Sequence, residues 1–402
     1  MSPTRTDTPT ESPSPVWLSP DDCDLAELRA LAAERTGPDD CPTAERIERN
    51  VPLYDSARLR ALAATPEGRR AVQGELVRVL LDGPGIVVLK DAFDDHGVVD
   101  RATAAFHTLI EEERASGAAR GDHFAATGAN DRVWNALEKM AVREPGLFAD
   151  YYANEMLALT ASAWLGPGYQ VTSQINVVNP GGAAQHVHRD YHLGFLSQER
   201  AAAYPAHVHR LSPVLTLQGA VAHGDMPVES GPTLYLPHSQ KYGPGYLAWR
   251  RPEFVAYFEE HHVQLPLEKG DAVFFNPALF HAAGENRSAG TRRMANLLQI
   301  SSAFGRAMEH VDRDAMCAAV HPVLVRRAAE GAGEGWLRRV VAATAEGYPF
   351  PTDLDRDPPA DGLAPPSQAE LVWRAVAEGW PPERLRTELR AATARRTGTE
   401  GS

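Results

Sequence analysis

The chain has 402 residues, of which 43% are hydrophobic and 23% are charged, as in an ordinary globular protein. Its net charge of −13 argues against a nucleic-acid partner, and no run approaches the ~18 consecutive apolar residues that a membrane-spanning helix needs. Its 3 cysteines are too few and too scattered for a disulfide framework or a thiolate metal site.

The N-terminal part of the chain predicts a tail followed by helices. Residues 1–16, rich in Ser, Thr and Pro, predict a disordered tail, and they lack the apolar segment of a secretory signal, which predicts a cytoplasmic protein. Residues 17–165 predict a helical region with one short strand at 85–90, packing on the core. Ser19-Pro20 and Thr65-Pro66 are typical helix starts, with a capping hydroxyl before a proline. The expected helices cover 20–34, 66–81, 98–117 and 144–165.

From about residue 169 the sequence changes to short β-rich runs separated by Gly, Pro and Asn. The expected strands cover residues 171–179, 186–192, 214–223, 233–236, 261–265, 271–276, 279–282 and 291–301. Short strands with turns between them indicate a sandwich or barrel, so residues 166–305 predict a mainly β core. Residues 306–402 return to helical composition and predict a C-terminal helical extension.

The candidate chemistry lies in the β-rich region, where 10 of the 15 histidines fall between His186 and His281. On an extended strand His188 and Asp190 would point to the same side. One imidazole and one carboxylate there supply two ligands of the 2-His-1-carboxylate triad of non-haem iron enzymes. His186 and His192 share the same alternation and are competing candidates.

A later strand should supply the third ligand and a cation. An apolar run from 271 to 280 leads through Asn-Pro to His281, and a turn follows at once. A 2-oxoglutarate enzyme also needs a cation for the far carboxylate of the cosubstrate, and arginine binds a carboxylate with two parallel hydrogen bonds. Arg292 and Arg293 open the next strand. Apolar residues occupy both alternations from 294 to 300, so the pattern leaves open which arginine faces inward.

Three segments resemble the phytanoyl-CoA dioxygenase family of Fe(II)/2-oxoglutarate oxygenases. They are QHVHRDYHLGF at 185–195, GPTLYLPHS at 231–239 and HAAGENRSAGTR at 281–292, within a resemblance that covers about 85–304. The resemblance implies a double-stranded β-helix, a cupin-like jelly roll, flanked by N- and C-terminal helices. It implies His188, Asp190 and His281 as iron ligands, and it places the carboxylate-binding arginine eleven residues after the distal histidine, at Arg292.

The resemblance also implies contacts and a reaction. Gln174, Asn176 and Gln218 lie in apolar β runs, where a buried amide must find partners, and the equivalent strands of the family line the cosubstrate pocket. The expected cofactors are Fe(II), 2-oxoglutarate and O₂, with succinate and CO₂ as coproducts and hydroxylation of a small molecule as the favoured outcome. Related halogenases have Gly or Ala at the carboxylate position, so Asp190 predicts hydroxylation or desaturation instead.

Other features leave alternatives open. A cupin-type isomerase or hydrolase without 2-oxoglutarate and a non-catalytic binding protein on the same fold remain rival hypotheses. His238 fits either the pocket or a hydrogen-bonded turn. Residues 198–210 are a candidate lid or a solvated loop, and 121–124 and 130–134 are candidates for the pocket border. The substrate, the oligomeric state and the role of the C-terminal helices do not follow from the sequence.

Overall fold

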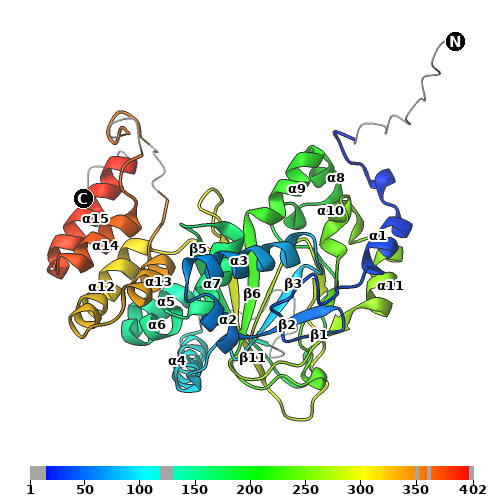
Figure 1. Ribbon diagram of the computed structural model, residues 1–402, viewed down its shortest axis with the longest axis horizontal. Coiled ribbons are helices and arrows are strands. Elements are labelled where there is room, and N and C mark those ends of the chain that lie inside the picture. The colour runs from blue at the N-terminus through cyan, green and yellow to red at the C-terminus, as the bar shows by residue number, and fades with distance from the viewer. Residues whose placement is uncertain (1–14, 118–129, 349–352, 360–363, 398–402) are drawn as a thin grey trace.

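The computed structural model describes residues 15–117, 130–348, 353–359 and 364–397 (Figure 1). The strands are β1 (Arg46–Glu48), β2 (Val51–Asp55), β3 (Ile86–Lys90), β4 (Asn130–Val133), β5 (Gln170–Val178), β6 (Thr216–Ala222), β7 (Leu234–Leu236), β8 (Val263–Gln264), β9 (Ala272–Phe275), β10 (Phe280–Ala282) and β11 (Arg293–Ser301). The helices are α1 (Leu25–Ala32), α2 (Ser56–Leu62), α3 (Pro66–Leu81), α4 (His96–Ala115), α5 (Ala136–Arg143), α6 (Pro145–Tyr152), α7 (Glu155–Leu165), α8 (Gln198–Ala202), α9 (Ala206–Val214), α10 (Gly245–Ala248), α11 (Pro252–His261), α12 (Arg313–Ala329), α13 (Glu334–Thr344), α14 (Gln368–Ala377) and α15 (Pro382–Thr397). No helix in these described ranges is long and apolar enough to cross a membrane.

Two sheets form the core. The large sheet has 8 strands in the order β1-β2-β3-β9-β6-β11-β5-β4, and the small sheet has 3 in the order β10-β7-β8. Side chains of both sheets line one cavity, and the rings of Tyr235 in β7 and Phe275 in β9 meet across it at 5.2 Å. Two such facing sheets, with helices before and after them, confirm the predicted double-stranded β-helix.

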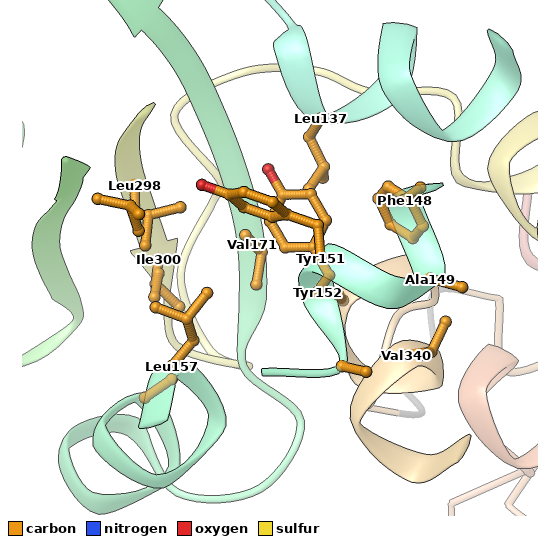
Figure 2. Packing of buried hydrophobic residues seen from close by; sticks show 14 of the residues in the cluster. Leu137, Phe148, Ala149, Tyr151, Tyr152, Leu157, Val171, Leu298, Ile300 and Val340 are labelled. Carbon is orange, nitrogen blue, oxygen red and sulfur yellow. The ribbon is translucent and has the colours of Figure 1, made fainter. Parts of the chain in front are cut away.

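The large sheet has one face covered by helices and one face toward the cavity. In β11 the buried Leu298 and Ile300 pack beneath the N-terminal helices, together with Tyr151 and Leu157 (Figure 2). The alternate residues, such as Leu297, point into the cavity. Because both faces are covered, apolar residues occupy both alternations of the strand.

The helices flank the sheets on opposite sides of the molecule. The C-terminal helices α12 to α15 pack on one another and on α5 and α6, at the end far from α1 and α11 (Figure 1). Thr65 caps α3 by accepting a hydrogen bond from the backbone of Gly68, with Pro66 in the first turn, which confirms that helix start.

Several predicted elements differ from the structure. The expected helix over 20–34 is divided into a 3₁₀ turn and α1, where Asp24 caps the new helix. The expected helix over 144–165 is divided into α6 and α7, because the Asn154 side chain accepts hydrogen bonds from two backbone N–H groups and starts a second helix. Residues 17–165 contain β1, β2 and β4 besides the expected strand β3. β1 and β2 were missed because they are short, charged or interrupted by Pro52.

The segment predicted as a strand over 186–192 is not a strand. Its β pairing is confined to one bridge, between His188 and His281. The backbone then turns through positive φ values at Tyr191 (45°) and His192 (42°) into a 3₁₀ turn. The pairing expected from alternation is therefore absent from most of this segment.

Candidate metal centre

His188, Asp190 and His281 come together although the strand predicted to carry the first two is absent. The backbones of His188 and His281 pair in both directions, with N–O distances of 2.9 and 3.2 Å, and Asp190 N donates to Pro277 O at 3.0 Å. Tyr246 Oη donates to Asp190 O at 2.9 Å. The chain around Asp190 is thus attached to the β9–β10 connection, which leads into β10 and His281.

The three side chains offer their ligand atoms to one point. Asp190 Oδ2 lies 3.8 Å from His188 Nε2 and 3.6 Å from His281 Nε2, and all three ligand atoms lie within 4.8 Å of one another. The centroids of the two imidazole rings are 4.3 Å apart. Two imidazoles and one carboxylate are the donor set of the facial triad that binds Fe(II) and leaves positions open. The residues present therefore fit a non-haem iron ion.

Hydrogen bonds fix the orientation of all three ligands. His188 Nδ1 lies 2.9 Å from the carbonyl oxygen of His186, and His281 Nδ1 lies 2.8 Å from that of Leu279. A carbonyl oxygen can only accept, so each Nδ1 carries the hydrogen and each Nε2 keeps a lone pair for a metal. Gln218 Nε2 donates to Asp190 Oδ2 at 2.6 Å and so holds the carboxylate.

The protonation states also suit metal binding. Burial, together with the neighbouring His281, lowers the pKa of His188, so its ring is neutral at neutral pH. Burial alone would favour protonated Asp190, but the two histidines and the hydrogen bond from Gln218 outweigh it and hold the pKa at about 2. The centre thus offers a neutral imidazole at His188 and an ionised carboxylate at Asp190.

The triad faces a cavity of about 730 Å³, within the usual range of ligand sites. Among the described residues, Asp190 is the only acidic residue that lines this cavity. Inward-facing residues of the large sheet form one wall, and Tyr235 and His281 of the small sheet lie in the opposite one. Along β11 the wall runs from Arg293 to Gln299, a distance of roughly 20 Å at the rise of a strand.

The two candidate arginines have opposite environments. Arg292 is 49% exposed in its side chain, donates to Asn179 and Asp131, and lies outside the cavity lining. Arg293 is 7% exposed and lines the cavity. Pairing of Arg293 with Val178 of β5 sets this alternation. The structure therefore places the side chain of Arg292, the predicted carboxylate-binding residue, away from the site, and that of its neighbour inside.

Arg293 has no counter-charge in the described protein. Burial lowers the pKa of Arg293 to about 10, so the group remains a cation at neutral pH, and its one charge partner of note is the hydroxyl of Tyr235. Thr233 and apolar side chains such as Met226 and Leu265 surround this end of the cavity. A buried, unpaired cation is costly and favours an anion beside it.

The three predicted amides take different positions. Gln218 lines the cavity and holds Asp190, as described above. Asn176 lines the cavity, and its buried Oδ1 has no hydrogen-bond partner in the described structure. Gln174 is buried but lies outside the lining, where its Oε1 accepts from Arg132.

Of the remaining candidate residues, one lines the cavity and the others that the structure describes lie outside its lining. His186 lines the cavity. His192 lies outside the lining, and its Nδ1 is 3.0 Å from Ser212 Oγ. His238 is buried in a turn with φ of 68°, outside the lining and 3.3 Å from Thr36 Oγ1. The lid candidate forms α8 and α9, and its Arg200, His207, His209 and Arg210 do not line the cavity. Residues 121–124 lie outside the described residues.

Several lining residues were missed or left open by the sequence. Of the border candidates at 130–134, Arg132 and Trp134 line the cavity. Phe195, Trp249 and Arg250 line it from loops, and no local pattern marks them. Pairing with Gln218 places Gln299 in the wall, so correct register would have identified it. Tyr235 lies in a segment already singled out, opposite His281.

A double-stranded β-helix with this donor set defines a metal-binding protein of the non-haem iron class. The sequence model of the family "Phytanoyl-CoA dioxygenase (PhyH)" matches residues 81–294, more than half of the chain. The chain belongs to the phytanoyl-CoA dioxygenase family, and the resemblance drawn from its motifs is confirmed.

The chain is also similar to individual proteins, among them the following three. Dioxygenase trt7 of Aspergillus terreus (strain NIH 2624 / FGSC A1156) is 25% identical over 238 residues, which are 58% of this chain and 75% of that protein. The structure of SnoK, a non-heme alpha ketoglutarate dependent carbocyclase from nogalamycin biosynthesis, is 22% identical with a TM-score of 0.42, covering 58% of this chain and 86% of that chain. The epimerase SnoN in complex with Fe3+, alpha ketoglutarate and nogalamycin RO is 19% identical with a TM-score of 0.36, covering 62% and 85%.

Proposed function

We propose that this protein is an Fe(II)- and 2-oxoglutarate-dependent oxygenase that hydroxylates a small organic molecule. The observation that carries the proposal is the convergence of His188, Asp190 and His281, whose ligand atoms lie within 4.8 Å of one another at the wall of a large cavity. Iron(II) held by these three residues supplies the open positions for 2-oxoglutarate and O₂. Overall, 2-oxoglutarate, O₂ and the substrate give succinate, CO₂ and the hydroxylated product.

Arg293 is the residue we assign to the far carboxylate of 2-oxoglutarate. It is buried, lacks an acidic partner among the described residues, and lies in an end of the cavity with apolar walls, where charge pairs are strong. The guanidinium can form two parallel hydrogen bonds to a carboxylate. Tyr235 and Thr233 are the neighbouring hydroxyl donors that we expect to complete this end.

Other residues of the site orient the metal ligands or exclude water from the centre. Gln218 holds Asp190, and the carbonyl oxygens of His186 and Leu279 hold the two rings, so the donors are in place before any ion binds. Phe275, whose ring lies 4.8 Å from that of His281, keeps water from this side of the centre.

The carboxylate of Asp190 supports hydroxylation rather than halogenation. It occupies the position where halogenases leave room for a halide, and Gln218 fixes it there. We expect incubation with chloride or bromide and the true substrate to give no halogenated product. Mass spectrometry of the products would detect a halogenated species and so contradict this expectation.

Succinate formation tests the proposal. Wild-type protein with Fe(II), O₂ and 2-oxoglutarate should release succinate, and a substrate screen should couple that release to a gain of one oxygen atom in the product. Asp190→Ala removes a ligand and should reduce succinate to background, while Asp94→Ala, which changes an exposed carboxylate remote from the cavity, should not. A wild-type reaction independent of 2-oxoglutarate would favour a cupin-type isomerase or hydrolase, and no reaction would favour a binding protein.

A further inference from the structure

We propose that the substrate of this oxygenase, given the function proposed above, is an organic carboxylate with a planar ring body, and that Arg250 binds its carboxylate. The inference rests on lining residues to which the proposed function assigns no role. They include Phe195, Trp134, Trp249, Met308 and two arginines, Arg132 and Arg250.

Two arginine–tryptophan pairs from separate parts of the chain line the cavity. The Arg250 guanidinium lies 4.0 Å from the centre of the Trp249 ring, and that of Arg132 lies 4.6 Å from the centre of the Trp134 ring. Stacking on an indole holds a guanidinium in one plane and leaves its edge available for hydrogen bonds. The described lining adds no acid other than the metal-binding Asp190, so the lining favours an anion.

The two arginines differ in their partners. Arg132 donates to Gln174 and lies near Glu309, whose pKa burial raises although the charge of Arg132 acts to lower it. Arg250 donates one hydrogen bond, from Nη1 to Leu196 O at 2.7 Å, and forms no ion pair with a described residue. Arg250 is thus held in place by Leu196 O, while no described residue neutralises its charge. It is the residue we assign to the substrate anion.

The rim is also apolar and aromatic. Phe195 is 58% exposed and Met308 is 39% exposed, although both border the cavity. Large apolar groups exposed together at the mouth of a cavity mark a binding surface. The exposed ring of Phe195 offers a flat face, which packs best against a planar ring.

The sheet wall of the cavity also carries polar groups. Asn176 Oδ1 and Gln299 Oε1 are buried without hydrogen-bond partners in the described structure, and both residues line the cavity. Gln299 is 7% exposed and lies opposite Gln218. A buried amide without a partner is costly, so these side chains favour a ligand with a hydrogen-bonding group directed toward this wall. The substrate therefore has an anion at one end, a ring body and a polar group facing the wall.

Binding of three matched probes tests this inference. The probes are naphthalene-2-carboxylate, its methyl ester and undecanoate, a flexible carboxylate with the same number of carbon atoms. Isothermal titration calorimetry is done without O₂, with Fe(II) and saturating 2-oxoglutarate, so that Arg293 is already occupied. We expect naphthalene-2-carboxylate to bind wild-type protein about tenfold more tightly than its methyl ester, since one charge-assisted hydrogen-bond pair contributes that much. We expect it to bind about tenfold more tightly than undecanoate, since the rigid ring packs on Phe195 at a lower cost in conformational entropy.

Two variants test which residues recognise the carboxylate and the ring, and a third serves as the control. Arg250→Met should remove the preference for the acid over the ester, and Phe195→Ala should reduce the preference for naphthalene-2-carboxylate over undecanoate several-fold. Arg326→Met, which removes the same charge from the surface of α12, should change neither preference. Equal binding of acid and ester to wild-type protein, no binding of the ring acid, or an unchanged preference in Arg250→Met would overturn the inference.

The two proposals fail separately. If the protein releases succinate from 2-oxoglutarate but shows none of these probe preferences, the substrate class is wrong and the oxygenase assignment stands. If the probes bind as expected but the loaded protein neither binds 2-oxoglutarate nor releases succinate, the oxygenase assignment is wrong.

Discussion

Leu297 and Leu298 are neighbours on β11, yet their side chains enter two different environments. Leu298 is 1% exposed and packs under the helices with Ile300 and Tyr151 (Figure 2). Leu297 is only partly buried and lines the cavity. On the helix-covered face a chain of hydrogen bonds runs from Thr103 through His223 to Tyr151, and Asn296 of β11 donates to the Tyr151 hydroxyl.

The cavity face carries polar and charged groups that have no partner among the described residues. Asn176, Gln218 and Gln299 each retain a buried oxygen without a partner in the described structure, and Arg293 retains an unpaired charge. Such groups cost stability unless a ligand completes them. One face of the same sheet therefore provides stability, and the other provides binding groups that await their partners.

The largest expected effect is on the helix-covered face. Leu298→Ala should lower the free energy of unfolding by about 2–5 kcal/mol, because it leaves a cavity in a packed core. Leu297→Ala, which removes the same atoms from the open face, should cost about 1 kcal/mol or less. Urea unfolding of the two variants measures the difference, and equal losses would show that the two faces are not distinct in packing.

The next largest effect is expected for Arg293→Met, which should weaken the binding of 2-oxoglutarate. It removes the cation assigned to 2-oxoglutarate and should weaken cosubstrate binding on the order of tenfold to a hundredfold. The matched control Arg292→Met removes an exposed guanidinium and should change the affinity by about twofold or less. Titration of 2-oxoglutarate into the Fe(II)-loaded, oxygen-free protein measures both. A larger loss in the control would return the assignment to Arg292.

Gln218→Leu should affect the metal centre without removing a ligand. Loss of the hydrogen bond to Asp190 should weaken Fe(II) binding by about tenfold, because a carboxylate that is not held must be oriented on binding. Thr172→Val, on a strand of the same sheet but outside the lining, is the control and should leave metal affinity unchanged. Equal Fe(II) affinity in Gln218→Leu and wild type would contradict a positioning role.

The smallest expected effect concerns pH and the helix-covered face. Burial lowers the pKa of His223 to about 3, so below the ordinary histidine pKa the unfolded chain binds a proton that the folded protein does not. Stability should therefore fall as the pH decreases from about 6.5 toward 3. In His223→Gln the loss of unfolding free energy between about pH 7 and about pH 5.5 should be smaller by about 1 kcal/mol. An identical loss in wild type and variant would remove His223 from this account.

The sequence predicted the parts of the site that local patterns and motifs determine. His188, Asp190 and His281 were selected through alternation on a strand and through family motifs, although the strand itself is absent. They meet because the backbones of the two histidines pair with each other, which is a tertiary contact that alternation does not reveal.

Other parts depend on contacts between distant segments. The choice between Arg292 and Arg293 required the register of β11 on β5, because apolar residues on both faces of that strand hide its alternation. Phe195, Arg250 and Met308 reach the cavity from loops that come together only in the folded chain. β1 and β2 join the large sheet at an edge, where short charged strands resemble loops in sequence.

Visible absorption of the oxygen-free complex tests most directly whether one iron ion, bound by these three residues, is chelated by 2-oxoglutarate. Wild-type protein loaded with Fe(II) and titrated with 2-oxoglutarate should develop a metal-to-ligand charge-transfer band that saturates at one cosubstrate per chain. His281→Ala, verified as folded by its thermal unfolding, should not develop it. Absence of the band from the wild-type protein, or an undiminished band in His281→Ala, would contradict the account.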